Sequence, residues 1–405
     1  MRAYERLINY VKVHTASSEE TDCTPSTKRQ FDLSNMLAEE MKAMGMENVS
    51  VTENAYVYGY LSATAGMEDK PCLGLVAHLD TVPDFSGENV KPRLIENYDG
   101  GEVVLGDSGR TLTPEKFPEL PEMKGKTLIV TDGTTVLGAD DKAGIAEILT
   151  ACEELINKNL PHGRIAVCFT PDEEIGHGAD LLDIEKLGAD FAYTMDGGEV
   201  NELSYETFNA SGAEFEINGF NVHPGSAKDV MINANLVAME INSMLPAGDI
   251  PEKTEDYEGF FHLTDMQGNV EKAVLKYIVR DHDKESFKAR ENCLRHIEKV
   301  INEKYGEGTA VLSIKEQYSN MAEFIKEHME IVELAKSAIE KAGVEAHIQP
   351  IRGGTDGANL SSKGLPCPNL GTGGYSFHGP YEHICVEDMD LAVEVILNIV
   401  EGIIK

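Results

Sequence analysis

Apolar residues follow two different patterns along the chain, and the change of pattern divides it into parts. Up to about residue 207, short continuous apolar runs alternate with segments whose apolar residues recur at helical spacing. Continuous apolar runs of this length are typical of strands that are buried on both faces of a parallel sheet. We predict such strands at residues 72–78, 127–131, 164–170 and 191–195. Helices are predicted at residues 3–13, 26–44 and 142–157.

The segment from about residue 208 to residue 319 has another order of elements. Its pattern predicts a strand, a long helix, two strands, a helix and a final strand, which is the order in a small α+β sandwich. The long helix is predicted within residues 222–245 and the second helix at residues 285–305. Helices at residues 323–342 and 387–404 then return to the first pattern.

The sequence therefore predicts an α/β fold with two domains. Residues 1–207 and 320–405 would form a catalytic domain around a mostly parallel sheet, because strands that alternate with helices build such sheets. Residues 208–319 would form a smaller α+β sandwich that is inserted into it as a lid. The length agrees with this division, since 405 residues correspond to roughly two to three domains.

Charge and cysteine content restrict the partners and the compartment. The chain has 35 basic and 70 acidic residues, a net charge of −35, and no basic patch offsets this excess, so nucleic acids and anionic membrane surfaces are excluded as partners. No stretch is apolar enough to span a membrane, and the N-terminal residues lack the apolar core of a secretory signal. The seven cysteines include no CxxC pair, which argues against a disulfide framework. We expect a cytoplasmic protein.

Polar residues gather where the predicted strands end. His78 ends the first predicted strand and Asp80 follows it, and Asp196 follows the last. Alternate residues of an extended chain point to the same side, so that His78 and Asp80 could face one ligand. The carboxyl ends of parallel strands also meet at one edge of the sheet, where binding sites form. A buried histidine beside a helix-capping aspartate is the simpler explanation for this pair alone.

Two pairs of adjacent carboxylates add to this edge. Asp140 and Asp141 directly precede a predicted helix. Asp140 could bridge two metal ions while Asp141 caps the helix, although both could merely start it. Glu173 and Glu174 follow the strand at residues 164–170. Neighbouring side chains in such a loop point in different directions, so one could bind a metal while the other acts as a base.

His378 lies in a glycine-rich segment and completes the candidate set. Carboxylate oxygens and imidazoles without thiolates suit Zn²⁺, Mn²⁺ or Co²⁺ in a hydrolytic site better than a structural zinc site. An aspartate shared by two ions would match the ~3.5–4 Å separation in two-metal hydrolases. The residues thus indicate a two-metal hydrolase and leave open which ligand holds which ion.

Seven segments of the chain resemble a known family. They are GLVAHLDTVPD, TDGTTVLGADDKAGIAEIL, TPDEEIGHGA, TMDGGEVNELSYETFNA, NVHPGSAKDVMINA, IRGGTDGANLSSKGLPCPNL and FHGPYEH. They are similar to the co-catalytic zinc metallopeptidases, a family that contains aminoacylases and glutamate-releasing carboxypeptidases, and within it to the aminopeptidases of tripeptides. The resemblance runs over nearly the whole chain. It implies a dizinc aminopeptidase; a dipeptidase or N-acyl-amino-acid deacylase of the same family, or a non-catalytic metal- or peptide-binding descendant, are the alternatives.

The resemblance also assigns roles to these residues. The five metal ligands that it implies are His78, Asp140, Glu174, Asp196 and His378. Asp140 would bridge the two zinc ions, with His78 and Asp196 on one ion and Glu174 and His378 on the other. Glu173 would be the general base, which takes a proton from water and gives it to the leaving amine. Asp80 would hold His78 in its ligating orientation.

The inserted domain and the segment around His378 complete the expectations. His223 resembles the lid histidine that stabilises the oxyanion, with a helix-terminal histidine as the alternative. Arg280 and Arg352 are predicted to bind the carboxylate of the substrate, and surface ion pairing is the alternative. Ser376 stands where the family commonly has asparagine, and Gly371 where it has an aromatic residue. A homodimer would form through the lid.

Overall fold

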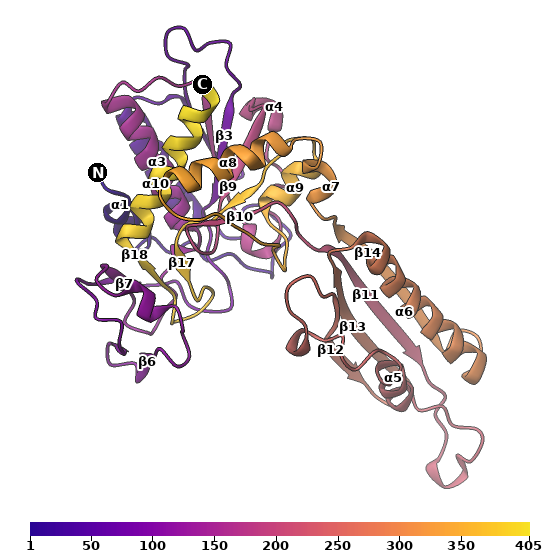
Figure 1. The fold of residues 1–405 in the computed structure, drawn as a ribbon. Coiled ribbons are helices and arrows are strands. Elements are labelled where there is room, and N and C mark those ends of the chain that lie inside the picture. Colours follow the sequence, from indigo (N-terminus) through magenta and orange to yellow (C-terminus); the bar gives the residue numbers. More distant parts are fainter. The chain divides into compact units, whose positions relative to one another are not determined.

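The computed structural model describes residues 1–405 and divides the chain into two compact units (Figure 1). Unit 1 contains Met1–Tyr205, Phe324–Gln349 and Thr355–Lys405, and unit 2 contains Glu206–Glu323 and Pro350–Gly354. The sequence pattern had assigned residues 350–354 to the first domain. They join unit 2 because Ile351 forms a parallel bridge with Thr207. None of the helices combines the length and the apolar character that a membrane span requires.

Unit 1 is built on an eight-stranded mixed sheet. Its strands lie in the order β1 (Glu47–Val51), β2 (Val57–Leu61), β8 (Ile165–Thr170), β3 (Leu73–His78), β9 (Phe191–Met195), β16 (Asn369–Leu370), β10 (Glu202–Ser204) and β15 (His347–Ile348). The four central strands from β8 to β16 run parallel, and β3 and β8 are buried along their whole length. The predicted α/β fold with a largely parallel central sheet is confirmed.

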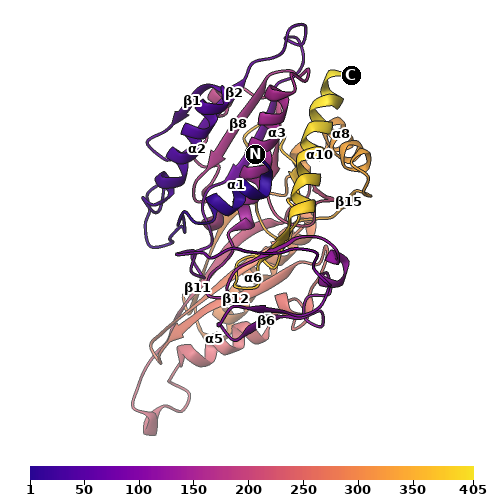
Figure 2. The same cartoon turned by 90° about the vertical axis from the view of Figure 1, so that its left-hand side faces the viewer.

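Helices cover both faces of this sheet. On one face, α3 (Ala139–Asn157) packs on β3 and contacts both α1 (Ala3–Tyr10) and α10 (Val386–Ile404), the face seen in Figure 2. The opposite face packs against α4 (Ile184–Leu187) and α9 (Asp356–Ser362), whose apolar residues share a core cluster with Val76 and Ala192. The remaining helices of the unit are α2 (Gln30–Met44) and α8 (Met329–Lys341). Because both faces are covered, only the edges and strand ends of the sheet can reach a ligand.

One predicted strand belongs to another sheet. The prediction that residues 127–131 join the parallel sheet is wrong, because β7 (Leu128–Val130) pairs antiparallel with β4 (Arg93–Ile95) and β18 (His383–Cys385). A buried apolar run reads the same in either sheet, and its pairing partners lie far away in the sequence. The fourth strand of this sheet is β17 (Gly374–Tyr375), and the connection from β17 to β18 carries His378.

Unit 2 is a four-stranded antiparallel sheet with two helices. The strands lie in the order β12 (Phe260–Gly268), β13 (Lys272–Asp281), β11 (Asn209–Asn218) and β14 (Ala310–Tyr318). Burial alternates along β11, and its inward residues share a core with α5 (Ala234–Ser243) and α6 (Lys284–Tyr305). The predicted order of strands and helices is confirmed.

Two helices differ from their predicted extents. Residues 222–233 are not helical apart from a single 3-10 turn at Pro224–Ser226, and α5 begins only after Asn233, whose side chain caps it. Proline and glycine at the start of this segment and an asparagine cap before α5 account for the late start. The helix predicted at residues 323–342 is divided into α7 (Ala322–Ile325) and α8.

Candidate active site

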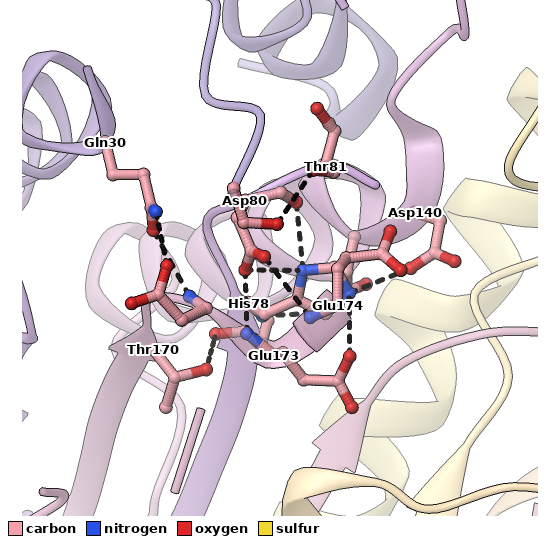
Figure 3. A network of polar contacts seen from close by, with 12 residues as sticks. Gln30, His78, Asp80, Thr81, Asp140, Thr170, Glu173 and Glu174 are labelled. Carbon is pink, nitrogen blue, oxygen red and sulfur yellow. Dashed lines mark hydrogen bonds and ion pairs between the residues drawn. The ribbon is translucent and has the colours of Figure 1, made fainter. Parts of the chain in front are cut away.

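His78 is the last residue of β3, and its ring is fixed at both nitrogens. Nδ1 lies 3.0 Å from the backbone oxygen of Asp80 and 3.5 Å from the Asp80 carboxylate. In the neutral ring, an Nδ1–H that donates to Asp80 leaves the lone pair on Nε2. Nε2 lies 2.9 Å from Oδ1 of Asp140. The end of β3 therefore presents Nε2 of His78 to the start of α3 (Figure 3).

The Asp80 carboxylate connects β3 to the loop after β8. Oδ1 accepts the backbone N–H of Glu173 at 3.0 Å, and Oδ2 accepts that of Glu174 at 3.2 Å (Figure 3). Asp80 is completely buried. It therefore positions the two adjacent glutamates as well as lying beside His78, a contact that the spacing of residues in the sequence could not indicate.

The Asp140 carboxylate lies between two imidazoles. Its Oδ1 faces His78, and its Oδ2 lies 3.2 Å from Nε2 of His378. The same His378 nitrogen lies 2.9 Å from Oε2 of Glu174. Residues from the end of β3, from the loop after β8 and from the β17–β18 connection thus gather around the carboxylate at the start of α3. A carboxylate with one oxygen toward each of two nitrogen ligands has the arrangement that a bridge between two ions requires.

Asp196 and Glu173 complete the cluster around His78. Oδ1 of Asp196, just after β9, lies 4.0 Å from Nε2 of His78, and Oε2 of Glu173 lies 3.9 Å from it. In two groups of three residues, the atoms that could bind a metal all lie within 4.8 Å of one another. One group is His78, Asp140 and Glu174, and the other is His78, Asp141 and Asp196. The structure therefore brings together all of the ligand and base candidates that the sequence indicated.

Asp141 belongs to one of these sets but is occupied by backbone contacts. Its Oδ2 accepts the N–H of His78 at 3.0 Å, and its Oδ1 accepts that of Gly144 at 3.3 Å. The second contact lies in the first turn of α3, where a carboxylate satisfies free amide groups. These bonds agree with the capping role that the sequence suggested, and they also tie β3 to α3.

The carboxylates of the cluster have perturbed pKa values. Burial and neighbouring carboxylates raise the pKa of Glu173 and of Glu174, and they raise that of Asp196 to about 7. Burial also acts to raise the pKa of Asp140, but the bonds to His378 and His78 outweigh it and lower the value. Several carboxylates in one buried place repel each other, so the cluster favours any positive charge that binds among them.

The pKa values of the two imidazoles are also raised, through their hydrogen bonds to carboxylates. Hydrogen bonds to Asp140 and Glu174 raise the pKa of His378 to about 11. Burial acts to lower the pKa of His78, but its bonds to Asp140 and Asp80 prevail and raise it. Two imidazole nitrogens and several carboxylate oxygens without a thiolate form a donor set that fits Zn²⁺, Mn²⁺ or Co²⁺.

Two further buried acids hold the loop of Glu173, and sequence reasoning missed both. Asp172 accepts bonds from Ser26 and Gln30 at 2.6–2.7 Å. Asp356 accepts the hydroxyl of Thr170 at 2.6 Å, and burial raises its pKa to about 6. Both lie inside the segments that resemble the family, but only their tertiary contacts distinguish them from other acids.

The candidates in unit 2 make contacts within that unit. His223 is exposed, and its Nδ1 accepts the N–H of Gly225 at 3.1 Å. Arg280 donates to the backbone oxygens of Ser211 on the neighbouring strand β11 and of Val279 on its own strand, and its guanidinium lies over the ring of Tyr318. Arg352 donates to Thr254 and to two backbone oxygens of residues 256–258 at 2.7–3.3 Å. These bonds connect the segments of unit 2 to each other.

Comparison with known proteins shows which family the chain belongs to. Residues 134–402 match the model of peptidase family M20/M25/M40. Peptidase T of Clostridium perfringens (strain 13 / Type A) is 57% identical over 401 residues, which are 99% of this chain and 98% of that protein. Peptidase T of Alkaliphilus oremlandii is 52% identical over 400 residues, 98% of each chain.

The chain belongs to peptidase family M20/M25/M40. The predicted resemblance is confirmed, and so is the prediction that the protein is a hydrolase of the peptidase class. Solved structures share the fold. The aminopeptidase PepT of Bacillus cereus ATCC 10987 has a TM-score of 0.79 at 24% identity and covers 100% of this chain and 98% of its own. A dinuclear metal-binding M20 peptidase of Bacillus subtilis has a TM-score of 0.64 at 17% identity, with 98% and 97% covered.

The two departures from the family pattern have local explanations. Ser376 has a φ of +56°, in the left-handed region that asparagine tolerates better than most residues, which is consistent with asparagine being common there. Gly371 lies so close to the backbone oxygen of Glu199 that a Cβ atom would clash with it. An aromatic side chain therefore does not fit at residue 371 in this backbone.

Metal binding is expected to release protons and to weaken as the pH falls. Both imidazoles have raised pKa values, and a metal binds only the deprotonated nitrogen. Each released proton weakens the affinity by about tenfold per pH unit of acidification. Zinc titration calorimetry at pH 8, in two buffers of different ionisation enthalpy, measures the proton count. As a control, replacing the exposed His328 by alanine should not change the number of protons released. Equal heats in both buffers, with an affinity that does not depend on pH, would contradict the expectation.

Proposed function

We propose that the chain is a dizinc aminopeptidase that removes the N-terminal residue from tripeptides. The observation that supports it most strongly is the Asp140 carboxylate, which directs one oxygen to His78 and the other to His378. Relatives that are more than half identical over nearly the full length are named peptidase T, which supports a peptide substrate. The role of such an enzyme is the breakdown of small peptides.

Five residues are assigned as metal ligands in this proposal. They are His78, Asp140, Glu174, Asp196 and His378, with Asp140 as the bridge, His78 and Asp196 for one ion, and Glu174 and His378 for the other. Bound ions of this kind polarise the peptide carbonyl and lower the pKa of water. The donor set suits Mn²⁺ and Co²⁺ as well as Zn²⁺. The solved neighbour described as a dinuclear metal-binding peptidase supports two ions. We leave Asp141 out of the ligands because backbone N–H groups occupy its oxygens.

Glu173 is assigned as the general base. Burial and the nearby Asp196 raise its pKa, which suits a group that accepts a proton and later releases it. Asp80 accepts the backbone N–H of Glu173, which fixes the position from which the Glu173 side chain extends. In the reaction the Glu173 carboxylate takes a proton from the attacking water and transfers it to the leaving amine.

Replacing Glu173 by glutamine should leave metal binding intact and lower kcat by about 10²–10⁴-fold, because the shape is kept and the proton acceptor is lost. Metal content and tripeptide hydrolysis are measured on the same sample. The matched control is Glu185→Gln at an exposed glutamate of α4. Activity close to that of the control variant would remove Glu173 as the base.

Unit 2 is assigned as the lid, and His223 as its contribution to catalysis. An exposed imidazole with one nitrogen already accepting a backbone N–H can direct the other nitrogen to a substrate oxyanion. Arg280 and Arg352 remain candidates for binding the substrate carboxylate. Their bonds to backbone oxygens favour a structural duty for Arg352 in particular, since both of its terminal nitrogens are used.

The His223→Ala variant should keep its metals and lose roughly 10²–10³-fold in kcat, the usual effect of removing an oxyanion donor. The change in KM should be small, because the contact forms mainly in the transition state. His296→Ala, at an exposed histidine of the same unit, is the control. If the His223→Ala variant has the kcat of the control, His223 has no catalytic role and only caps the turn at Gly225.

The substrate is tested with a dipeptide, a tripeptide, a tetrapeptide and an N-acetylated tripeptide, followed by identification of the products. We expect the free tripeptide to be preferred and to lose its first residue. Preference for the dipeptide would instead indicate a dipeptidase, and hydrolysis of the N-acetyl group would indicate a deacylase. No turnover of any of the four with two bound ions would favour the non-catalytic alternative.

The remaining assignments concern partners and location. Leu236 and Met239 are exposed on α5 of unit 2, and a second copy of the chain could pack there to form a homodimer. Sedimentation would then give twice the 44.3 kDa mass of the chain. All seven cysteines are unpaired, which supports the cytoplasm as the compartment.

A further inference from the structure

Glu382 is a buried carboxylate on the β17–β18 connection, four residues after His378. Only 1% of it is exposed. Its Oε2 accepts the backbone N–H groups of Leu137 at 2.6 Å and of Gly138 at 2.8 Å, and its Oε1 accepts that of Asp140 at 3.0 Å. All three donors lie where the chain enters α3, so one carboxylate satisfies three amide groups at the start of the helix.

The β17–β18 connection that carries Glu382 also carries His378, so it contacts Asp140 at two places. The His378 ring faces Oδ2 of Asp140, while Glu382 holds the backbone N–H of the same aspartate. Asp140 is thus held at its side chain and at its main chain by two residues of one short segment. Glu382 also lines the same small pocket as Asp140, Glu174 and His378.

We propose that Glu382 is a positioning residue, which fixes the backbone of Asp140 so that its two oxygens face His78 and His378. The proposal rests on the dizinc site proposed above, and it gives this site a support that none of the ligand assignments includes. If the bonds from residues 137–140 loosen, the Asp140 carboxylate can rotate away from one histidine, and the ion that this histidine shares with it is bound less tightly. Residues that orient a metal ligand typically change metal affinity by about 10–100-fold when they are replaced.

The alternative is that Glu382 only stabilises the fold by satisfying three buried N–H groups. Both roles predict a loss of stability on mutation, so stability alone cannot distinguish them. Metal affinity and the geometry around the ion can, because a purely structural bond would not change them in a protein that still folds.

The Glu382→Gln variant is the first test. Glutamine has the same shape, but its amide group is a donor at one end and therefore cannot accept all three N–H groups. We expect the zinc dissociation constant of the more weakly bound ion, measured by chelator competition, to rise by about 10–100-fold. We also expect the visible spectrum of the Co²⁺-loaded protein to change, since it reports the coordination geometry.

Glu147→Gln is the matched control. Glu147 is a fully buried glutamate in α3, the helix that also contains Asp140, and neither of its carboxylate oxygens has a hydrogen-bond partner. It should leave the zinc affinity and the Co²⁺ spectrum as in the wild type. If Glu382→Gln does not fold, Glu382→Asp is measured in the same way. Aspartate keeps the charge but is shorter by one methylene group, so it should also weaken zinc binding, by a smaller factor.

Wild-type zinc affinity and an unchanged Co²⁺ spectrum in a folded Glu382 variant would overturn the positioning role, whatever its melting temperature. The wild-type protein in the same experiment distinguishes this result from a failure of the proposed function. Two bound ions and tripeptide hydrolysis in the wild type, with no effect of Glu382, would reject only the positioning role. A wild-type protein that binds no divalent ions would reject the dizinc site itself.

Discussion

The Asp140 carboxylate lies between His78 and His378, and much of unit 1 is arranged so that this contact can form. His78 comes from the end of a buried parallel strand, Asp140 from the entry to a buried helix, and His378 from a connection in a second sheet. Two segments that lie 62 and 238 residues from Asp140 in the sequence must therefore be placed within about 3 Å of its carboxylate. A site made in this way depends on the packing of the whole unit.

The same arrangement concentrates negative charge in a buried place, and the protein offsets this charge locally. Backbone N–H groups bind Asp80, Asp141 and Glu382, and the two imidazoles bind Asp140 and Glu174. What remains is a set of carboxylates whose pKa values are raised by burial and mutual repulsion. Cations that bind only to the folded protein would relieve this repulsion and stabilise the native state through mass action. The net charge of −35 belongs mostly to the surface, whereas these few acids are gathered in the interior at the candidate site.

The strand-end residues could be found from the sequence, because parallel strands bring their carboxyl ends to one edge and place His78, Asp80 and Asp196 there. Contacts between distant loops could not. Three features depend on partners far away in the chain: the antiparallel pairing of β7, the hydrogen bonds that Glu382 accepts at the start of α3, and the bonds of Arg352. The helix expected within residues 222–245 was predicted too long for a local reason. The helical pattern was extended through Pro224 and Gly225, which interrupt it.

In the proposed site one carboxylate, Asp140, is shared by two metal ions. Crystals of the zinc-loaded protein, measured at the zinc absorption edge, test this sharing. Two anomalous peaks roughly 3.5–4 Å apart are expected. One should lie beside His78 and Asp196 and the other beside Glu174 and His378, with an oxygen of Asp140 on each. A single peak, or two peaks of which only one contacts Asp140, would show that Asp140 does not bridge two ions.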